Sequence, residues 1–151
     1  MRDTPFSSLG IPASGMRTYQ TWIDATGDNV ANINTINPAG QAAFQERFVI
    51  AQASEGDQVG GARAAGVGSS GTGAIGDGVY VSGAAFGDAE GRMVYNPDHP
   101  YADADGMVRM PDIDMSTQMT NLIVAQRAYS ANVTVFQGAR DTYLRALEIG
   151  K

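Results

Sequence analysis

Apolar residues recur at alternating intervals of four and three positions along the last part of the chain. An average spacing of 3.5 residues is typical of a helix that lies along another helix. The pattern therefore predicts a long C-terminal helix with one apolar seam, interrupted by the polar residues Gln126 and Arg140. The seam consists of Met115, Met119, Leu122, Gln126, Tyr129, Val133, Phe136, Arg140, Tyr143 and Leu147.

A second apolar seam with the same spacing lies near the start of the chain. It consists of Leu9, Ala13, Met16, Gln20, Ile23, Gly27 and Val30. The predicted helix begins near Thr4, a good capping residue, and runs to about Ile33, ahead of the turn sequence in residues 37–40. Pro12 lies inside the pattern, and it either kinks this helix or moves its start to about Ile11.

Seams at both ends predict a mainly α fold. We expect discontinuous N- and C-terminal helices, paired as an antiparallel coiled-coil-like hairpin around a glycine-rich, partly β or extended insert. The helical core then comprises residues 1–36 and 112–151, and the insert spans residues 37–111. Segment 55–91 is dominated by Gly, Ala and Ser. Such a composition gains little from burial, so this segment is expected to be mobile unless something outside holds it.

Short strands are predicted within the insert. Residues 43–52 have the composition of a strand, and residues 78–82 form a second, shorter one. Residues 92–95 are expected to pair with 78–82 across the intervening turn. Residues 107–110 are a further extended piece, and the two prolines in 96–100 favour a turn or extended chain.

Charge narrows the classes of partner. The 151 residues include 10 basic and 16 acidic side chains, which gives a net charge of -6. Nucleic acid and anionic membrane surfaces are therefore disfavoured partners. No stretch approaches the roughly 18–20 apolar residues of a membrane span. No cleavable secretory signal is visible at the N-terminus, so we expect any export to use a route that cleaves nothing.

Candidate chemistry is weak. The chain has no cysteine, which excludes disulfides, thiolate catalysis and Cys-ligated metals. Residues 101–106 resemble part of a calcium loop, but Tyr101 occupies the first ligand position and a solvated acidic turn is favoured. His99 beside Asp98 has no partner for catalysis, and a loop hydrogen bond is favoured. The glycine spacing in residues 71–76 lacks the strand and helix of a dinucleotide site. We expect no cofactor, no metal and no enzymatic activity.

Two helices alone leave several apolar side chains poorly covered, and neighbouring copies are the simplest cover. These side chains are Tyr19, Trp22, Ile33, Ile123, Val124, Val135 and Leu144.

Several motifs together resemble the flagellar basal-body rod proteins. The first is Ser14-Gly15-Met16, and the second is the Asn-rich segment 29–35. The third is the linker 95–114, and the helix after it continues the match. The matching positions in that helix are Met119, Leu122, Ala125, Arg127, Tyr129, Ala131 and Asn132.

This resemblance implies a non-enzymatic subunit of the proximal rod in the flagellar basal body, which spans the periplasm. It implies polymerisation in a helical array that transmits torque. The implied partners are copies of the chain and other rod proteins, together with the flagellar type III export apparatus, through which the chain would pass unfolded. Surrounding ring proteins are additional candidates.

The residues expected in the assembly interface or helical seam come from both helices. They are Met16, Tyr19, Ile23, Asn29, Val30, Asn32, Met119, Leu122, Tyr129, Asn132, Val133, Phe136, Tyr143 and Leu147. Asn29 and Asn32 are placed where carboxamides can satisfy backbone groups at a helix end. The acids at 98, 103, 105, 112 and 114 either meet a basic partner or, as is favoured, form a solvated surface; 112 and 114 also suit the positive end of the terminal helix.

Two alternatives remain open. One is a secreted binding or adaptor protein that docks a partner helix and never polymerises. The other is an enzyme that uses His99 with Asp98 or Asp103.

Overall fold

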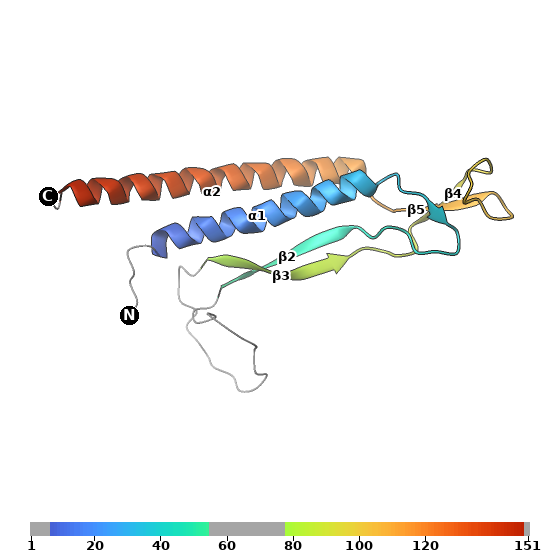
Figure 1. The fold of residues 1–151 in the computed structure, drawn as a ribbon, viewed down its shortest axis with the longest axis horizontal. Coiled ribbons are helices and arrows are strands. Elements are labelled where there is room, and N and C mark those ends of the chain that lie inside the picture. Colours follow the sequence, from blue (N-terminus) through green and yellow to red (C-terminus); the bar gives the residue numbers. More distant parts are fainter. Residues whose placement is uncertain (1–6, 55–77, 150–151) are drawn as a thin grey trace, which may run out of the picture.

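Two long helices form the body of the molecule. The computed structural model describes residues 7–54 and 78–149. The N-terminal helix α1 (Ser7–Asn32) and the C-terminal helix α2 (Met115–Ile149) lie side by side and run in opposite directions (Figure 1). The predicted pairing of the two terminal helices is confirmed, whereas their coiled-coil packing stays a prediction.

The helix ends follow from local chemistry. Pro12 lies inside α1, so a start at Ile11 is wrong, and Thr4 lies outside the described residues. At the start of α2, the Asp114 carboxylate accepts hydrogen bonds from the Thr117 amide at 2.8 Å and the Thr117 hydroxyl at 2.7 Å. These bonds lower the pKa of Asp114, the hydroxyl bond contributing most. The predicted acid at the positive helix end is confirmed at Asp114.

The insert contains more strand than predicted, so the fold combines two long helices with a substantial amount of antiparallel sheet. Two long strands, β2 (Arg47–Ala53) and β3 (Val79–Phe86), pair as an antiparallel ribbon. A second antiparallel sheet has the strand order β1 (Asn37–Pro38), β5 (Met107–Met110), β4 (Arg92–Tyr95). We call these the ribbon and the small sheet.

Three strand predictions need correction. Strand β2 begins at Arg47 rather than at residue 43, and β3 continues to Phe86 within the stretch expected to be mobile. The rest of that stretch, residues 55–77, lies outside the described residues. Strand β4 pairs with β5 instead of β3. One reason is local: Gly91 adopts a left-handed φ of 59°, and its position lies against the backbone of Met110 at the end of β5.

Helix α1 lies between α2 and the ribbon (Figure 1). Its side chains hold the ribbon at both ends. The Asn29 amide donates to the Arg47 carbonyl at 3.0 Å and accepts from the Arg47 amide at 2.8 Å. The Val79 amide donates to the Ser14 hydroxyl at 3.1 Å. Between Ser14 and Asn29 the helix rises about 22 Å. A seven-residue strand spans about 23 Å, so helix and ribbon match in length.

Among the described residues, the buried apolar core is small and lies mostly at the end that carries the small sheet. Val108 at the centre of β5 is fully buried and pairs with Pro38 on one side and Val94 on the other. The remaining buried apolar side chains at this end are Ile33, Ala43, Pro111 and Ile113.

Candidate assembly interface

The buried line of α2 is displaced from the predicted seam. Gln118 is 1% exposed and Ala125 is fully buried, whereas the predicted Met119 is 38% exposed and Gln126 is exposed. The shared positions Leu122, Tyr129, Phe136 and Tyr143 are half-buried. At alternate positions of the seam, the residue that faces α1 is therefore the one immediately before the predicted residue.

The same displacement occurs in α1. Its most buried positions are small or polar: Pro12, Gly15, Thr18, Thr26 and Asn29. Four of these lie one residue before a predicted seam position, and the fifth, Thr18, lies toward the ribbon. Small side chains allow two helix backbones to approach closely, and this explains why the larger apolar neighbours flank the contact instead of filling it.

Two contacts fix the register of the helix pair. A Cβ atom at Gly15 would lie 2.5 Å from the Asn132 side-chain oxygen, and Asn29 donates to the Gln118 side-chain oxygen at 3.1 Å. The two contacts lie 14 residues apart on each helix. That separation corresponds to about 21 Å of continuous antiparallel contact. Both contacts involve residues from the motifs that indicated the family.

Asn29 is the centre of a buried polar network that joins three segments. Besides its two bonds to Arg47, its amide reaches Gln118 of α2, and Gln118 donates to the Glu46 carboxylate at 2.6 Å. Arg47 also forms an ion pair with Asp28 of α1. Each satisfied hydrogen bond contributes about 1 kcal/mol, while leaving one buried partner unsatisfied costs more.

Asn32 and Asn132 use their carboxamides on their own helices. Asn32 donates to the Asp28 carbonyl at 2.9 Å, and Asn132 donates to the Ala128 carbonyl at 2.8 Å. Asn32 thus contacts one carbonyl, that of Asp28, near the end of α1. Asn29 instead serves the backbone of β2.

The other predicted interface residues lie along both helices, and all of them except Leu147 are half-buried. Leu147 is 54% exposed. The half-buried positions not yet placed are Met16, Tyr19, Ile23, Val30 and Val133.

Many apolar side chains are exposed, and the sequence predicted some of them. The predicted uncovered residues on α2 are confirmed, with exposed fractions of 50% for Ile123, 48% for Val124, 59% for Val135 and 50% for Leu144. The prediction is wrong for Ile33, which is 8% exposed.

Sequence analysis missed two further groups of exposed apolar side chains, because strand pairing sets their exposure. They comprise Phe48, Ile50, Tyr80 and Phe86 on the ribbon, and Met93 and Tyr95 on β4.

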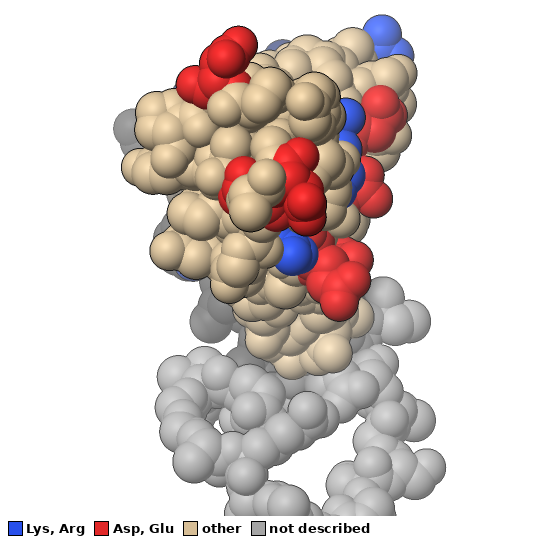
Figure 2. Space-filling view, turned by 90° about the vertical axis from the view of Figure 1, so that its right-hand side faces the viewer, with Lys and Arg blue, Asp and Glu red and all other residues tan. Residues whose placement is uncertain are grey.

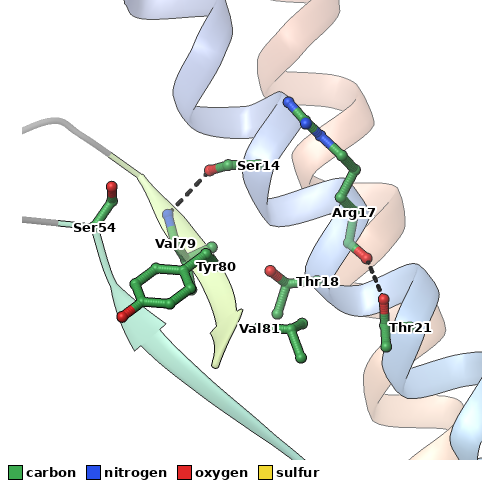
Figure 3. Close-up of a pocket in the computed structure, with 8 residues that line it drawn as sticks. All are labelled: Ser14, Arg17, Thr18, Thr21, Ser54, Val79, Tyr80 and Val81. Atoms are coloured by element: carbon green, nitrogen blue, oxygen red, sulfur yellow. Dashed lines mark hydrogen bonds between the residues drawn. The ribbon is translucent and has the colours of Figure 1, made fainter. Parts of the chain in front are cut away.

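A groove separates α1 from the ribbon (Figure 3). It consists of two neighbouring cavities of 360 Å³ and 190 Å³ that share Thr18 and Val79. We call it the ribbon groove. It is lined by Ser14, Arg17, Thr18, Tyr19, Thr21, Trp22, Val49, Ala51, Ser54, Val79, Tyr80 and Val81. Tyr19 and Trp22 stack with ring centroids 6.0 Å apart, which gives the groove a partly aromatic wall.

The acids of the linker lie at the end of the molecule that carries the small sheet, where Figure 2 shows patches of acidic side chains with few basic ones between them. The Asp103 carboxylate accepts the amides of Asp105 at 3.0 Å and Met107 at 2.8 Å, and the His99 ring accepts the amide of Tyr101 at 3.2 Å. These groups shape turns. In residues 7–54 and 78–149, no three acidic or histidine side chains are grouped to hold a metal ion.

The net charge of -6 disfavours an anionic membrane surface as a partner. Over the described residues, neither helix combines the length and apolar character needed to cross a bilayer.

Comparison with known proteins gives a consistent result. The profile of the family described as "Flagellar basal body rod FlgEFG protein C-terminal" matches residues 104–149, which include β5 and α2. The chain is 32% identical to the flagellar basal-body rod protein FlgC of Bacillus subtilis (strain 168), over 98% of this chain and 99% of the relative. It is 31% identical to FlgC of Yersinia enterocolitica, over 93% and 94%. It is 26% identical to FlgC of Aquifex aeolicus (strain VF5), over 97% of both chains.

Proposed function

Because the chain belongs to the family of the flagellar basal-body rod protein FlgC, we propose that it polymerises in a helical array that transmits torque in the proximal rod. It is a structural subunit of the rod, and its place is the flagellar basal body, where it assembles with other rod components. The finer statements below concern how this chain would do so.

One observation carries the proposal: α1 covers only part of α2, whose uncovered apolar side chains extend along most of its length. Ile123 and Val124 lie in the first third of α2, Val135 in the middle, and Leu144 and Leu147 in the last third. Each is about half exposed, so covering one contributes roughly 1 kcal/mol, half the usual value for full burial. A neighbouring subunit along the whole helix would therefore add several kcal/mol.

The layered arrangement favours an open array over a closed dimer. The exposed side chains of α2 lie on one side of α1, and the ribbon with its exposed aromatic side chains lies on the other (Figure 1). Contacts between two different surfaces are heterologous, and they form helical arrays when the rotation between subunits does not close. Long interlocked helices in coiled-coil-like contact would make such an array stiff under torsion.

A small core also suits transport of the chain. We propose export unfolded through the flagellar type III apparatus, with the helical core of residues 1–36 and 112–151 completed only on arrival. Few buried apolar side chains need to be unpacked for that passage. Surrounding ring proteins are proposed as further neighbours, and no enzymatic role is proposed.

The test replaces Val135 by Asp in a motile, flagellated host that depends on this chain. Val135 is 59% exposed, so the isolated monomer should melt at an unchanged temperature. Incorporation into basal bodies and swimming in soft agar should both be lost, because a charge would then have to be buried at the interface. The matched control is Gln137→Asp, at another exposed position of α2, which should swim normally.

Normal incorporation of the Val135→Asp protein would contradict the proposal. One copy bound per partner, with no array, would instead support the adaptor alternative.

A further inference from the structure

We propose that the C-terminal end of α2 from one copy docks into the ribbon groove of a second copy, with Glu148 paired to Arg17. This inference rests on the proposed polymerisation and names one of its contacts. The occupant is a second copy of this chain, and the contact is the same for each successive pair of subunits.

The hydrogen bonds that join α1 to the ribbon lie at the two ends of the ribbon, on either side of the groove. Ser14 and Asn29 hold the two ends of the ribbon, while the side chains between them on α1 include the small Thr18 and Thr21. Figure 3 shows Thr18 and Val81 on facing sides of the space, with Tyr80 beside it. A gap with apolar and hydroxyl walls can accept aliphatic side chains, and its hydroxyl groups remain accessible to water.

A positive charge stands at the rim of this groove. Arg17 lines the larger cavity and is exposed, and it forms no ion pair with any described residue. The nearest acid along the helix, Asp24, lies almost two turns away and accepts instead from Gln20 at 3.4 Å. An incoming carboxylate would therefore meet a guanidinium that no described acid pairs, and the planar guanidinium suits a carboxylate well.

The end of α2 has the complementary composition. Leu144 and Leu147 are 50% and 54% exposed, and Glu148 is exposed and in no ion pair with a described residue. The three share one face, because residues three and four apart are neighbours on a helix. Asp141, the other acid on α2, is already paired with Arg140 at 3.0 Å. Charge thus selects Glu148, with the two leucines beside it.

The two surfaces of one molecule cannot meet each other. Helix α2 lies on one side of α1 and the groove lies on the opposite side, between α1 and the ribbon (Figure 1). A given molecule therefore offers its α2 end to one neighbour and accepts the α2 end of another. That asymmetry produces a chain of subunits rather than a closed pair.

Charge exchange tests the pairing in the full-length protein. Arg17→Glu and Glu148→Arg should each raise the concentration needed for polymerisation about tenfold, because each places like charges together at the contact. The double variant restores the opposite pair with its polarity reversed and should return to within about twofold of the unmodified chain. Double-variant behaviour no better than either single variant would overturn the proposal. Monomer melting temperatures check that all three variants fold.

Cross-linking gives an independent arm, since the chain contains no cysteine. Arg17→Cys with Glu148→Cys, treated with a short thiol-reactive cross-linker in the polymer, should give a ladder of covalent multimers. The matched control pair, Arg17→Cys with Arg127→Cys, should give no ladder of multimers.

The outcomes separate this inference from the proposed function. If the cysteine variant polymerises but gives no cross-linked ladder, or a ladder that stops at the dimer, the docking of α2 into the ribbon groove is overturned. The proposed polymerisation is then unaffected. Failure of the unmodified chain to polymerise with its rod partners contradicts the proposed function itself.

Discussion

The two ends of the molecule differ in how completely they are covered. At the sheet end, the small sheet packs against the loop at residues 39–43, Val108 is fully buried, and the Asn29 network joins three segments. At the helix end, Leu144, Leu147 and Ile149 of α2 are 50%, 54% and 86% exposed. The sheet end buries its own apolar side chains, whereas the helix end offers apolar surface that no other described residue covers.

This difference separates two requirements within one short chain. Stability of the monomer depends on a few buried contacts near the small sheet and on the register of the helix pair. In the function proposed above, assembly depends on exposed side chains that contribute little to the monomer. Substitutions at the two ends should therefore affect different measurements, and the following predictions test that separation.

The largest expected effect comes from a charge in the core of the sheet end. Val108→Asp should cost about 4 kcal/mol or more, because an unpaired carboxylate would be buried between β1 and β4. Urea unfolding followed by circular dichroism measures the loss. Leu147→Asp at the helix end is the matched control and should leave the unfolding midpoint nearly unchanged. Equal destabilisation by both substitutions would remove the distinction between the ends.

A smaller effect is expected where the helices approach most closely. Gly15→Val should cost about 2 kcal/mol, since its side chain would overlap that of Asn132. Gly27→Val is the control on the same helix, where an added Cβ has nothing within 4 Å. Thermal melting should separate the two variants. The Gly15 penalty should shrink in an Asn132→Ala background, and an undiminished penalty there would place the cause elsewhere.

The polar network should contribute about 1–2 kcal/mol through Gln118. Gln118→Ala leaves the buried Asn29 amide and the Glu46 carboxylate without a shared partner. Gln126→Ala, at an exposed position two turns further on, is the comparison variant. Chemical denaturation of both at equal concentration measures the difference. If Gln126 proved the costlier of the two, the predicted seam rather than the observed one would describe the contact.

The smallest effect concerns Asp114 at the start of α2, an exposed group. Hydrogen bonds lower its pKa in the folded chain, so its stabilising contribution is present above its ordinary pKa of 3.8 and is lost as the pH falls through the lower folded value. Asp114→Asn retains an acceptor but does not titrate. Melting temperatures of the two proteins should differ above pH 4 and converge in more acidic solution. Parallel curves throughout would assign the acid sensitivity to other carboxylates.

The sequence predicted the helices well because their pattern is local. Four-and-three spacing identified both helices and their pairing, and Asp114 marked the start of α2. The predicted seam lies one residue away from the observed contact because the pattern follows large apolar side chains. The helices instead approach through Gly15, Ala125 and the amides of Asn29 and Gln118, which pattern analysis treats as neutral or polar.

The strand pairing and the groove could not be predicted in the same way. The partner of β4 depends on where the turn at Gly91 directs the chain, and this is a tertiary result. The ribbon groove depends on two anchor points, Ser14 and Asn29, whose partners lie 65 and 18 residues away. Both anchor residues belong to the sequence motifs that resemble the flagellar rod family, and these motifs are visible without knowledge of the fold.

Two hydrogen bonds join the Asn29 carboxamide to the backbone of Arg47 at the edge of the ribbon. A carboxamide that both donates to and accepts from a strand residue occupies the place that another strand would take. At the opposite corner the Ser14 hydroxyl accepts the amide of Val79 and donates to the Ile11 carbonyl of its own helix. A two-stranded ribbon with aromatic side chains is otherwise a template for amyloid-like stacking among crowded molecules. The helix thus occupies one position on the outer edge of each ribbon strand, where a further strand would otherwise pair.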